Sequence, residues 1–133
     1  TTLQLAEIVA AAVPPAERRK AKNPARRTFQ AIRIAVNSEL DALNEGLDAI
    51  FDCLAPGGRL CVITFHSLED RIVKAAFQQA AQGCTCPKDF PVCICGKKPK
   101  VRLTPRKPIL PDEREIEENP RARSAKLRVC EKI

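Results

Sequence analysis

The sequence predicts an α/β fold, and three successive segments carry that prediction. Residues 29–54 hold an apolar stripe with the three- and four-residue spacing of an amphipathic helix. A Pro-Gly-Gly turn then leads into residues 59–65, a near-continuous apolar run with β-branched residues in its middle. A further helical segment follows over residues 68–81. Helix, strand and helix in succession are typical of chains that cover a sheet with helices.

The elements before the strand are predicted from periodicity and from helix stop signals. Residues 2–13 have helical periodicity, and Pro14-Pro15 ends that helix. The basic stretch 16–22 is expected to be a linker. Asn23-Pro24 has the pattern of an N-cap with proline at the first helical position, so one helix is expected from there to residue 54. Gly46 within it favours a bend, because glycine costs about 1 kcal/mol against alanine.

The strand over residues 59–65 suits a position buried on both faces of a parallel sheet. Ser67 is expected to cap the following helix, with Glu69 and Asp70 in the first turn, where the helix dipole favours acids. Open α/β sheets build their ligand crevices outside the carboxyl ends of their strands, and His66-Ser67 lies at such an end. The sequence therefore points to this junction as a site.

The remaining third of the chain is less regular. Residues 83–111 are rich in proline, glycine and cysteine and are expected to form an irregular excursion. Residues 112–118 can form a short helix. Residues 124–132 alternate as a closing strand, and Ala125, Leu127 and Val129 are expected to point inward.

Composition and charge exclude some functions. The chain has 133 residues and a net charge of +7. It holds no run of about 18 apolar residues, which excludes a membrane span, and no signal peptide is visible. Basic residues cluster in 17–33 and 97–107, as expected of a protein that binds nucleic acid or another polyanion, although solvated loops give the same pattern. With five Phe and no Tyr or Trp, a base-stacking platform is not expected.

Three segments carry a resemblance to a known family. They are RTFQAIRIAVNSEL at 27–40, APGGRLCVITFHSLEDRIVK at 55–74 and ENPRARSAKLRV at 118–129. Together they resemble the bacterial 16S ribosomal RNA cytosine-N4 methyltransferase family, whose members depend on S-adenosylmethionine. The resemblance covers nearly the whole chain. One departure is Asn23, where the family pattern has histidine before the proline.

The resemblance implies a domain organisation. Residues 1–38 would be the end of a helical insertion domain, a possible RNA-recognition domain. Residues 39–133 would be the carboxyl-terminal half of a Rossmann-like class I methyltransferase sheet. The half of the family that binds the methyl donor is expected upstream of Thr1, so the chain is expected to be a fragment that is inactive alone and prone to self-association.

His66 and Ser67 are the candidate catalytic residues. His66 is the only histidine of the chain and therefore the side chain expected to titrate near neutrality. It could orient the cytosine or accept the proton that leaves its amine, or it could be a structural, hydrogen-bonded residue at a strand end. Ser67 could be a direct ligand or only a helix cap.

Five arginines are candidate RNA contacts: Arg26, Arg27, Arg33, Arg121 and Arg123. Each could contact a phosphate or form an internal ion pair. For the last two, Glu117 and Glu118 are the acids nearest in sequence.

Four cysteines form two Cys-x-Cys pairs: Cys84 with Cys86, and Cys93 with Cys95. Four thiolates within twelve positions can surround a tetrahedral zinc ion, although Cys-x2-Cys is the commoner spacing. Reduced free thiols, or disulfides formed after purification, are the alternatives. The other three, Cys53, Cys61 and Cys130, lie in apolar patterns and are expected in the core.

The function expected from the resemblance is methylation of the N4 amine of a cytosine in 16S ribosomal RNA, in the bacterial cytoplasm, with S-adenosylmethionine as donor. The partner would be 16S ribosomal RNA or the small ribosomal subunit. The alternative is a non-enzymatic, zinc-bearing RNA-binding module, for which the basic segments and the four cysteines would be central.

Overall fold

The computed structural model describes residues 1–20, 23–87 and 92–133. They form two compact units, Thr1–Glu39 and Leu40–Ile133. Helices and a small sheet are both present, so the predicted combination of helices and strands is confirmed. Within the described ranges, no helix is long and apolar enough to cross a membrane. The origin of the first unit as an insertion domain stays a prediction.

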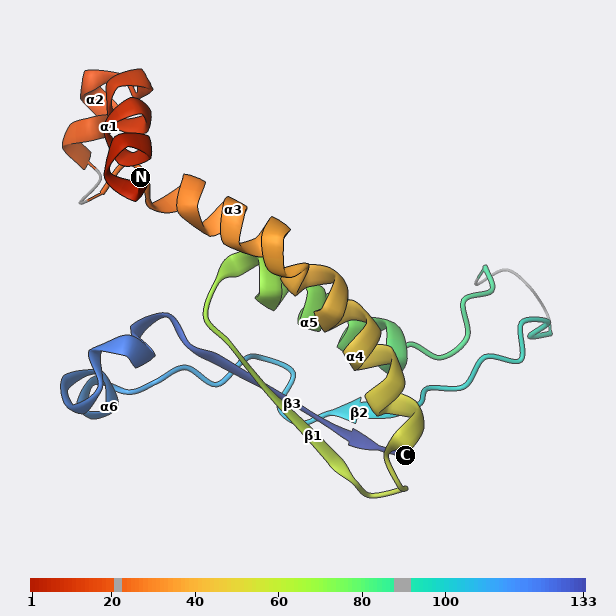
Figure 1. Cartoon of the computed structure of the whole chain (residues 1–133). Helices are drawn as coiled ribbons and strands as arrows, with labels where there is room; N and C mark the ends of the chain where they lie inside the picture. The colour runs from red at the N-terminus through yellow and green to blue at the C-terminus, as the bar shows by residue number, and fades with distance from the viewer. Residues whose placement is uncertain (21–22, 88–91) are drawn as a thin grey trace. The chain divides into compact units, whose positions relative to one another are not determined.

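The first unit begins with two helices (Figure 1). α1 (Thr2–Ala12) starts with a capping box, in which the backbone N–H of Gln4 donates to Thr1 Oγ1. α2 (Pro15–Lys20) lies where a linker was predicted, and that prediction was wrong. Proline is well suited to the first turn of a helix, and the residues after it are good helix formers.

The predicted long helix is divided in two at Ser38. α3 (Arg26–Asn37) ends there, because Ser38 has a φ of 50°, in the left-handed region. α4 (Glu39–Cys53) begins at the next residue, and Gly46 lies inside it without ending it. The predicted cap, Asn23, lies before the helix start: its Oδ1 accepts from the backbone N–H of Ala25 at 3.0 Å.

The second unit contains a three-stranded sheet (Figure 1). Its strands are β1 (Arg59–Thr64), β2 (Val101–Leu103) and β3 (Lys126–Lys132), in the order β1-β3-β2. Both pairings with β3 are antiparallel, so β1 and β2 run in the same direction. The parallel pairing predicted for β1 is not found within the described residues, since its partner there is antiparallel.

Besides α4, three helical segments complete the second unit. α5 (Ser67–Ala81) connects β1 toward β2. α6 (Glu113–Glu118), capped by Asp112, lies where a short helix was predicted. A 3-10 helix (Pro120–Ser124) then leads directly into β3.

The turn into β1 requires its two glycines. Gly57 has a φ of 79°, a backbone conformation that residues with a side chain rarely adopt. A Cβ on Gly58 would lie 2.8 Å from the backbone oxygen of Ala55. The turn is fastened to the end of β3, because Gly57 donates to the backbone oxygen of Lys132 and Lys132 donates back to Gly58. The predicted stop of the preceding helix is therefore also a sheet connection.

The core lies between one face of the sheet and two helices. α5 packs on all three strands, and α4 contributes two side chains to the same cluster. Phe51 and Phe77 meet edge to face, with ring centroids 5.8 Å apart. The buried hydrophobic members are Leu47, Phe51, Val73, Phe77, Val101 and Cys130.

The face of β3 that meets the helices is not the predicted one. Lys126 and Arg128 contact α5, and Cys130 lies in the core. Because side chains alternate along a strand, Leu127 and Val129 face the other side. The prediction that they point inward was wrong, since the helix-facing side of β3 is formed by Cys130 and by two basic residues that share an internal partner.

That partner is Asp70, a buried carboxylate on α5. Arg128 donates to both of its oxygens, with Nε 2.7 Å from Oδ1 and Nη2 3.3 Å from Oδ2. Lys126 Nζ lies 3.1 Å from Oδ2. A two-pronged arginine–carboxylate pair fixes geometry as well as charge. This ion cluster therefore sets how α5 lies on the central strand.

Replacing Asp70 by asparagine should destabilise the fold strongly. The Arg128 side chain is only 11% exposed and would keep its charge without a counter-charge. We expect Asp70→Asn to lower the free energy of unfolding in urea by about 3–5 kcal/mol, as when one partner of a buried pair is removed.

The matched control is Glu118→Gln, which breaks an ion pair with Arg114, a side chain that is 86% exposed. That change should cost about 0.5 kcal/mol or less.

The pKa of Asp70 is lowered from 3.8, chiefly by the hydrogen bond from Arg128. Its stabilisation is therefore present above pH 3.8 and is lost as the pH falls through the lower folded pKa. Equal stability of the two variants at neutral pH would contradict the role given to Asp70.

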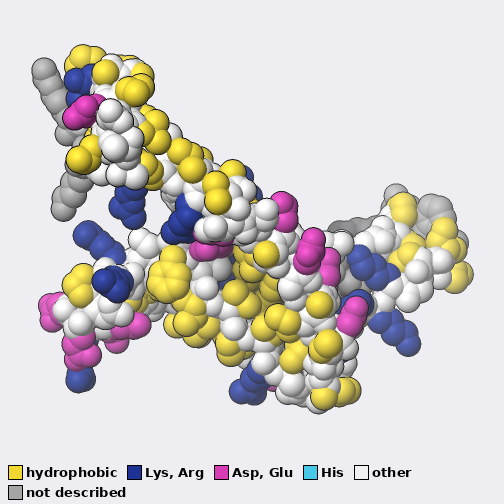
Figure 2. Space-filling view, viewed as in Figure 1, with side chains coloured by type: hydrophobic (Ala, Val, Ile, Leu, Met, Phe, Trp, Pro, Cys, Tyr) yellow, Lys and Arg dark blue, Asp and Glu magenta, His cyan; other side chains and the backbone are white. Residues whose placement is uncertain are grey.

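β1 is one of the two edge strands of the described sheet, and the face of the sheet away from the helices is partly open. Ile63 is 58% exposed on that face, next to Leu127 across the strands. Figure 2 shows hydrophobic side chains at the surface over the strands. An unpaired edge beside an apolar surface favours association between chains.

We therefore expect the isolated chain to self-associate, with its mean mass in light scattering rising with concentration. Ile63→Lys should reduce the association without lowering the melting temperature, because the position is exposed. Val36→Lys, at a 77% exposed position of the first unit, is the control and should change nothing. A monomer at every concentration would refute the expectation.

Candidate functional site

The junction between β1 and α5 is built around a reciprocal cap. His66 is the N-cap of α5, and its Nδ1 accepts from the backbone N–H of Glu69 at 3.3 Å. The Glu69 carboxylate accepts in return from the backbone N–H groups of Phe65 and His66, at 2.9 and 3.1 Å. Histidine thus stands where serine or threonine usually completes a capping box. This arrangement holds the imidazole ring at the carboxyl end of β1.

The cap also determines what the ring can do. Since Nδ1 accepts a hydrogen bond, the proton of the neutral ring is on Nε2. Nε2 is buried and makes no hydrogen bond within the described residues, although Glu69 Oε1 lies 3.2 Å away. The His66 side chain as a whole is 14% exposed. In this geometry the ring offers a donor rather than a free basic nitrogen.

Ser67 has a different place from the one predicted. It is the first residue of α5 and is exposed, whereas the cap is His66. The prediction that Ser67 caps the helix was therefore wrong, and its catalytic role stays a prediction. Histidine is not among the preferred N-cap residues, which is why the sequence pattern pointed one position too far.

Arg121 and Arg123 lie at the same end of the sheet as His66. They belong to the 3-10 helix that enters β3, and the first residue of β3 pairs with Thr64, the last residue of β1. Both arginines are exposed, and neither has an ion-pair partner in the part of the chain that the structure describes. Glu118, considered as a partner, pairs with Arg114 instead.

The arginines of the first unit differ from one another. Arg33 forms an ion pair with Glu39, with its Nε 2.9 Å from Oε1. Arg26 and Arg27 begin α3 and are exposed. The RNA-binding role of all three stays a prediction.

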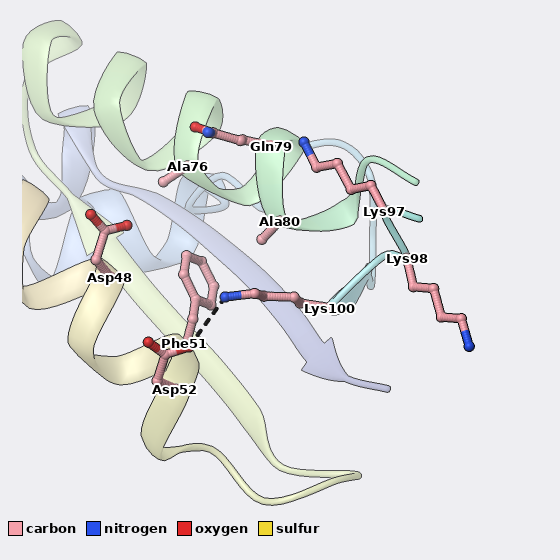
Figure 3. Close-up of a pocket in the computed structure, with 9 residues that line it drawn as sticks. All are labelled: Asp48, Phe51, Asp52, Ala76, Gln79, Ala80, Lys97, Lys98 and Lys100. Atoms are coloured by element: carbon pink, nitrogen blue, oxygen red, sulfur yellow. Dashed lines mark hydrogen bonds and ion pairs between the residues drawn. The ribbon is translucent and has the colours of Figure 1, made fainter. Parts of the chain in front are cut away.

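A groove that the sequence did not predict lies at the other end of α5 (Figure 3). It has a volume of about 280 Å³ and carries both acids and lysines on its walls. Lys100 pairs with Asp52 at 3.2 Å, whereas Lys98 points away from the groove. Arg102, further along the same basic segment, pairs with Glu131 at 2.6 Å. Part of the basic segment 97–107 is therefore neutralised internally. The groove is lined by Asp48, Phe51, Asp52, Ala76, Gln79, Ala80, Lys97, Lys98 and Lys100.

The four cysteines of the excursion are gathered in one place. Their sulfurs all lie within 4.8 Å of one another. Backbone N–H groups of Lys97 and Thr85 donate to Cys95 and lower its pKa to about 5. The backbone N–H of Cys86 also favours the thiolate of Cys84, but the neighbouring thiols outweigh it and raise the pKa of Cys84 to about 12.

The other three cysteines are only partly where the sequence placed them. Cys130 is fully buried in the core, as predicted. Cys53 and Cys61 are exposed, so the core prediction was wrong for both. Cys61 lies on the open face of the sheet, and Cys53 is the last residue of α4.

Comparison with known proteins gives one consistent result. The profile of the MraW methylase family matches residues 1–133. The chain is 58% identical over 132 residues to the ribosomal RNA small subunit methyltransferase H of Heliobacterium modesticaldum, covering 99% of this chain and 42% of that protein. It is 59% identical over 133 residues to the protein of the same name from Acetivibrio thermocellus, covering 100% and 42%.

The chain thus spans less than half the length of these relatives. Its own full length, by contrast, is matched, including the β1–α5 junction and the 3-10 helix before β3. The chain belongs to the MraW methylase family.

Proposed function

We propose that this chain is the part of an S-adenosylmethionine-dependent enzyme that positions a cytosine of 16S ribosomal RNA for methylation at its N4 amine. Family membership supports methyl transfer, and the names of the relatives support the small-subunit RNA as substrate. The observation that carries the proposal is the convergence of two motifs at one end of the sheet. The pairing of Thr64 with Lys126 brings the His66 cap and the arginine-bearing 3-10 helix together.

The described residues do not fit the methyl donor. The chain's adjacent glycines, Gly57 and Gly58, form the turn into β1 and are hydrogen-bonded to Lys132. They lie at the opposite end of β1 from His66. A glycine-rich strand-to-helix loop, the usual cradle for such a nucleoside, is not present in the described ranges. We therefore place the donor site in the rest of the protein and propose that this chain alone is inactive.

The topology of the sheet also supports a donor site in the rest of the protein. β1 and β2 run in one direction with α5 between them, as in a crossover of a doubly wound sheet. The open edge of β1 is where further strands would pair, extending the three strands into a Rossmann-like sheet. His66 would then lie at the carboxyl end of an inner strand, where such sheets bind ligands.

In this proposal His66 orients the cytosine. Once the base displaces the groups that bury Nε2 in this chain, its N–H can donate to the ring nitrogen or carbonyl oxygen of the base, which are acceptors. The lone pair of the exocyclic amine is delocalised into the ring, so the rate of methylation depends on how the amine is placed against the methyl donor. Arg121 and Arg123, exposed and without acidic partners in the described structure, would contact the RNA backbone.

The match of the whole chain to a methylase family favours this enzyme over a non-enzymatic, zinc-bearing RNA-binding module. The two functions can be told apart in the full-length protein. The proposed enzyme methylates RNA and requires His66 to do so, whereas a binding module has no methylation activity to lose.

His66→Ala in a full-length protein carrying this sequence should lower single-turnover methylation by about 10² or more. It also removes the cap, which should cost about 0.5–2 kcal/mol of stability. His66→Ser separates the two effects, because serine restores the cap and lacks the Nε2 donor. We expect His66→Ser to melt like the wild type and to be as slow as His66→Ala. A wild-type rate in the serine variant would exclude the orienting role.

Exchanging Arg121 and Arg123 for glutamine should weaken RNA binding without changing the melting temperature, because both side chains are exposed. Each lost phosphate contact should make the logarithmic salt dependence of affinity shallower by about 0.7–0.9. Arg114→Gln is the control, since that arginine already pairs with Glu118. Equal RNA affinity of the control and the double variant would place the RNA elsewhere.

A further inference from the structure

Cys84, Cys86, Cys93 and Cys95 form a cluster with the dimensions of a metal site. Three sulfur–sulfur separations define a nearly equilateral triangle: 3.3 Å from Cys93 to Cys84, 3.6 Å from Cys93 to Cys95 and 3.6 Å from Cys95 to Cys84. Cys86 lies within 4.8 Å of all three. Zinc–sulfur bonds of about 2.3 Å in a tetrahedron require sulfurs about 3.8 Å apart. Three of the sulfurs therefore need to move apart by only a few tenths of an ångström, and Cys86 needs to approach them by about 1 Å or less, for the cluster to hold one ion.

We infer that these four cysteines bind a single structural zinc ion as thiolates. All four thiols are free, and four sulfur ligands in a tetrahedron select zinc over the harder divalent ions. Four protein ligands leave no open position for water or substrate, which is the mark of a structural rather than a catalytic site.

The surroundings of the sulfurs fit a metal-bound state. The backbone N–H of Cys86 donates to the sulfur of Cys84 at 3.4 Å. Such outer hydrogen bonds orient thiolate ligands and disperse their charge. Lys97 and Lys98 follow the last ligand after one glycine, and their charge opposes the net negative charge of a zinc ion with four thiolates.

The place of the cluster in the fold indicates what the ion does. The excursion leaves α5 at Ala81 and returns at Lys100, whose backbone N–H donates to the backbone oxygen of Ala80 at 2.7 Å. Neither helix nor strand is found in residues 82–87 and 92–100. A metal that cross-links positions 84 to 95 would supply the order that secondary structure does not, because binding energy becomes local folding energy.

The test begins with the protein purified anaerobically with its thiols reduced. We expect one zinc per chain by elemental analysis. Replacement by Co²⁺ should give the visible bands of tetrahedral cobalt and a sulfur-to-cobalt charge-transfer band. Cys84→Ser and Cys95→Ser should each lose the stoichiometric metal. Cys53→Ser and Cys61→Ser, at exposed cysteines outside the cluster, should keep it.

A chelator should raise hydrogen exchange in residues 83–87 and 92–99 while β1 and β3 stay protected, so the loss of metal is separable from loss of the fold. No zinc bound after reconstitution, an octahedral cobalt spectrum, iron in place of zinc, or equal zinc loss in the Cys53→Ser control would each overturn the inference. These measurements do not depend on methyl transfer, so they test the zinc site independently of the proposed function.

Discussion

The second unit depends on the ion cluster of Asp70 with Arg128 and Lys126. Asp70 lies in the first turn of α5, and its backbone N–H donates to the backbone oxygen of His66, the cap of that helix. Its two partners are on β3, the strand that lies between the other two. One buried carboxylate thus fixes the helix, the central strand and the capped histidine relative to one another. The geometry of the candidate site therefore depends on this ion cluster, which lies beside the site and is not proposed to contact the substrate.

The same cluster shows which features the sequence could predict and which it could not. The alternation of β3 correctly predicted a strand, yet apolar residues were assigned to the wrong face. Lys126 and Arg128 look like solvent-facing residues until their partner is known, and that partner is 58 positions away from Arg128. The alternation of side chains along a strand shows which residues share a face, but it does not show a counter-charge that lies far away in the sequence.

Local signals were stronger guides. The Pro-Gly-Gly turn, the start of α5 within one residue and the short helix before Asn119 follow from capping and turn chemistry. The break at Ser38 was not predictable, because the apolar stripe continues through it and serine carries no strong preference for the left-handed region. The antiparallel partner of β1 was missed for a similar reason: an apolar strand shows its burial and not the direction of its neighbour.

The strand order has a consequence for biosynthesis. β3 comes last among the three strands in the chain and yet lies between the other two. Until Lys126 and the residues after it are synthesised, β1 and β2 lack the strand that lies between them, and Asp70 has no counter-charge. Until the last strand emerges, the second unit lacks the contacts that β3 makes with β1, β2 and α5, so part of its apolar surface stays uncovered. Contacts of such long sequence separation also form slowly.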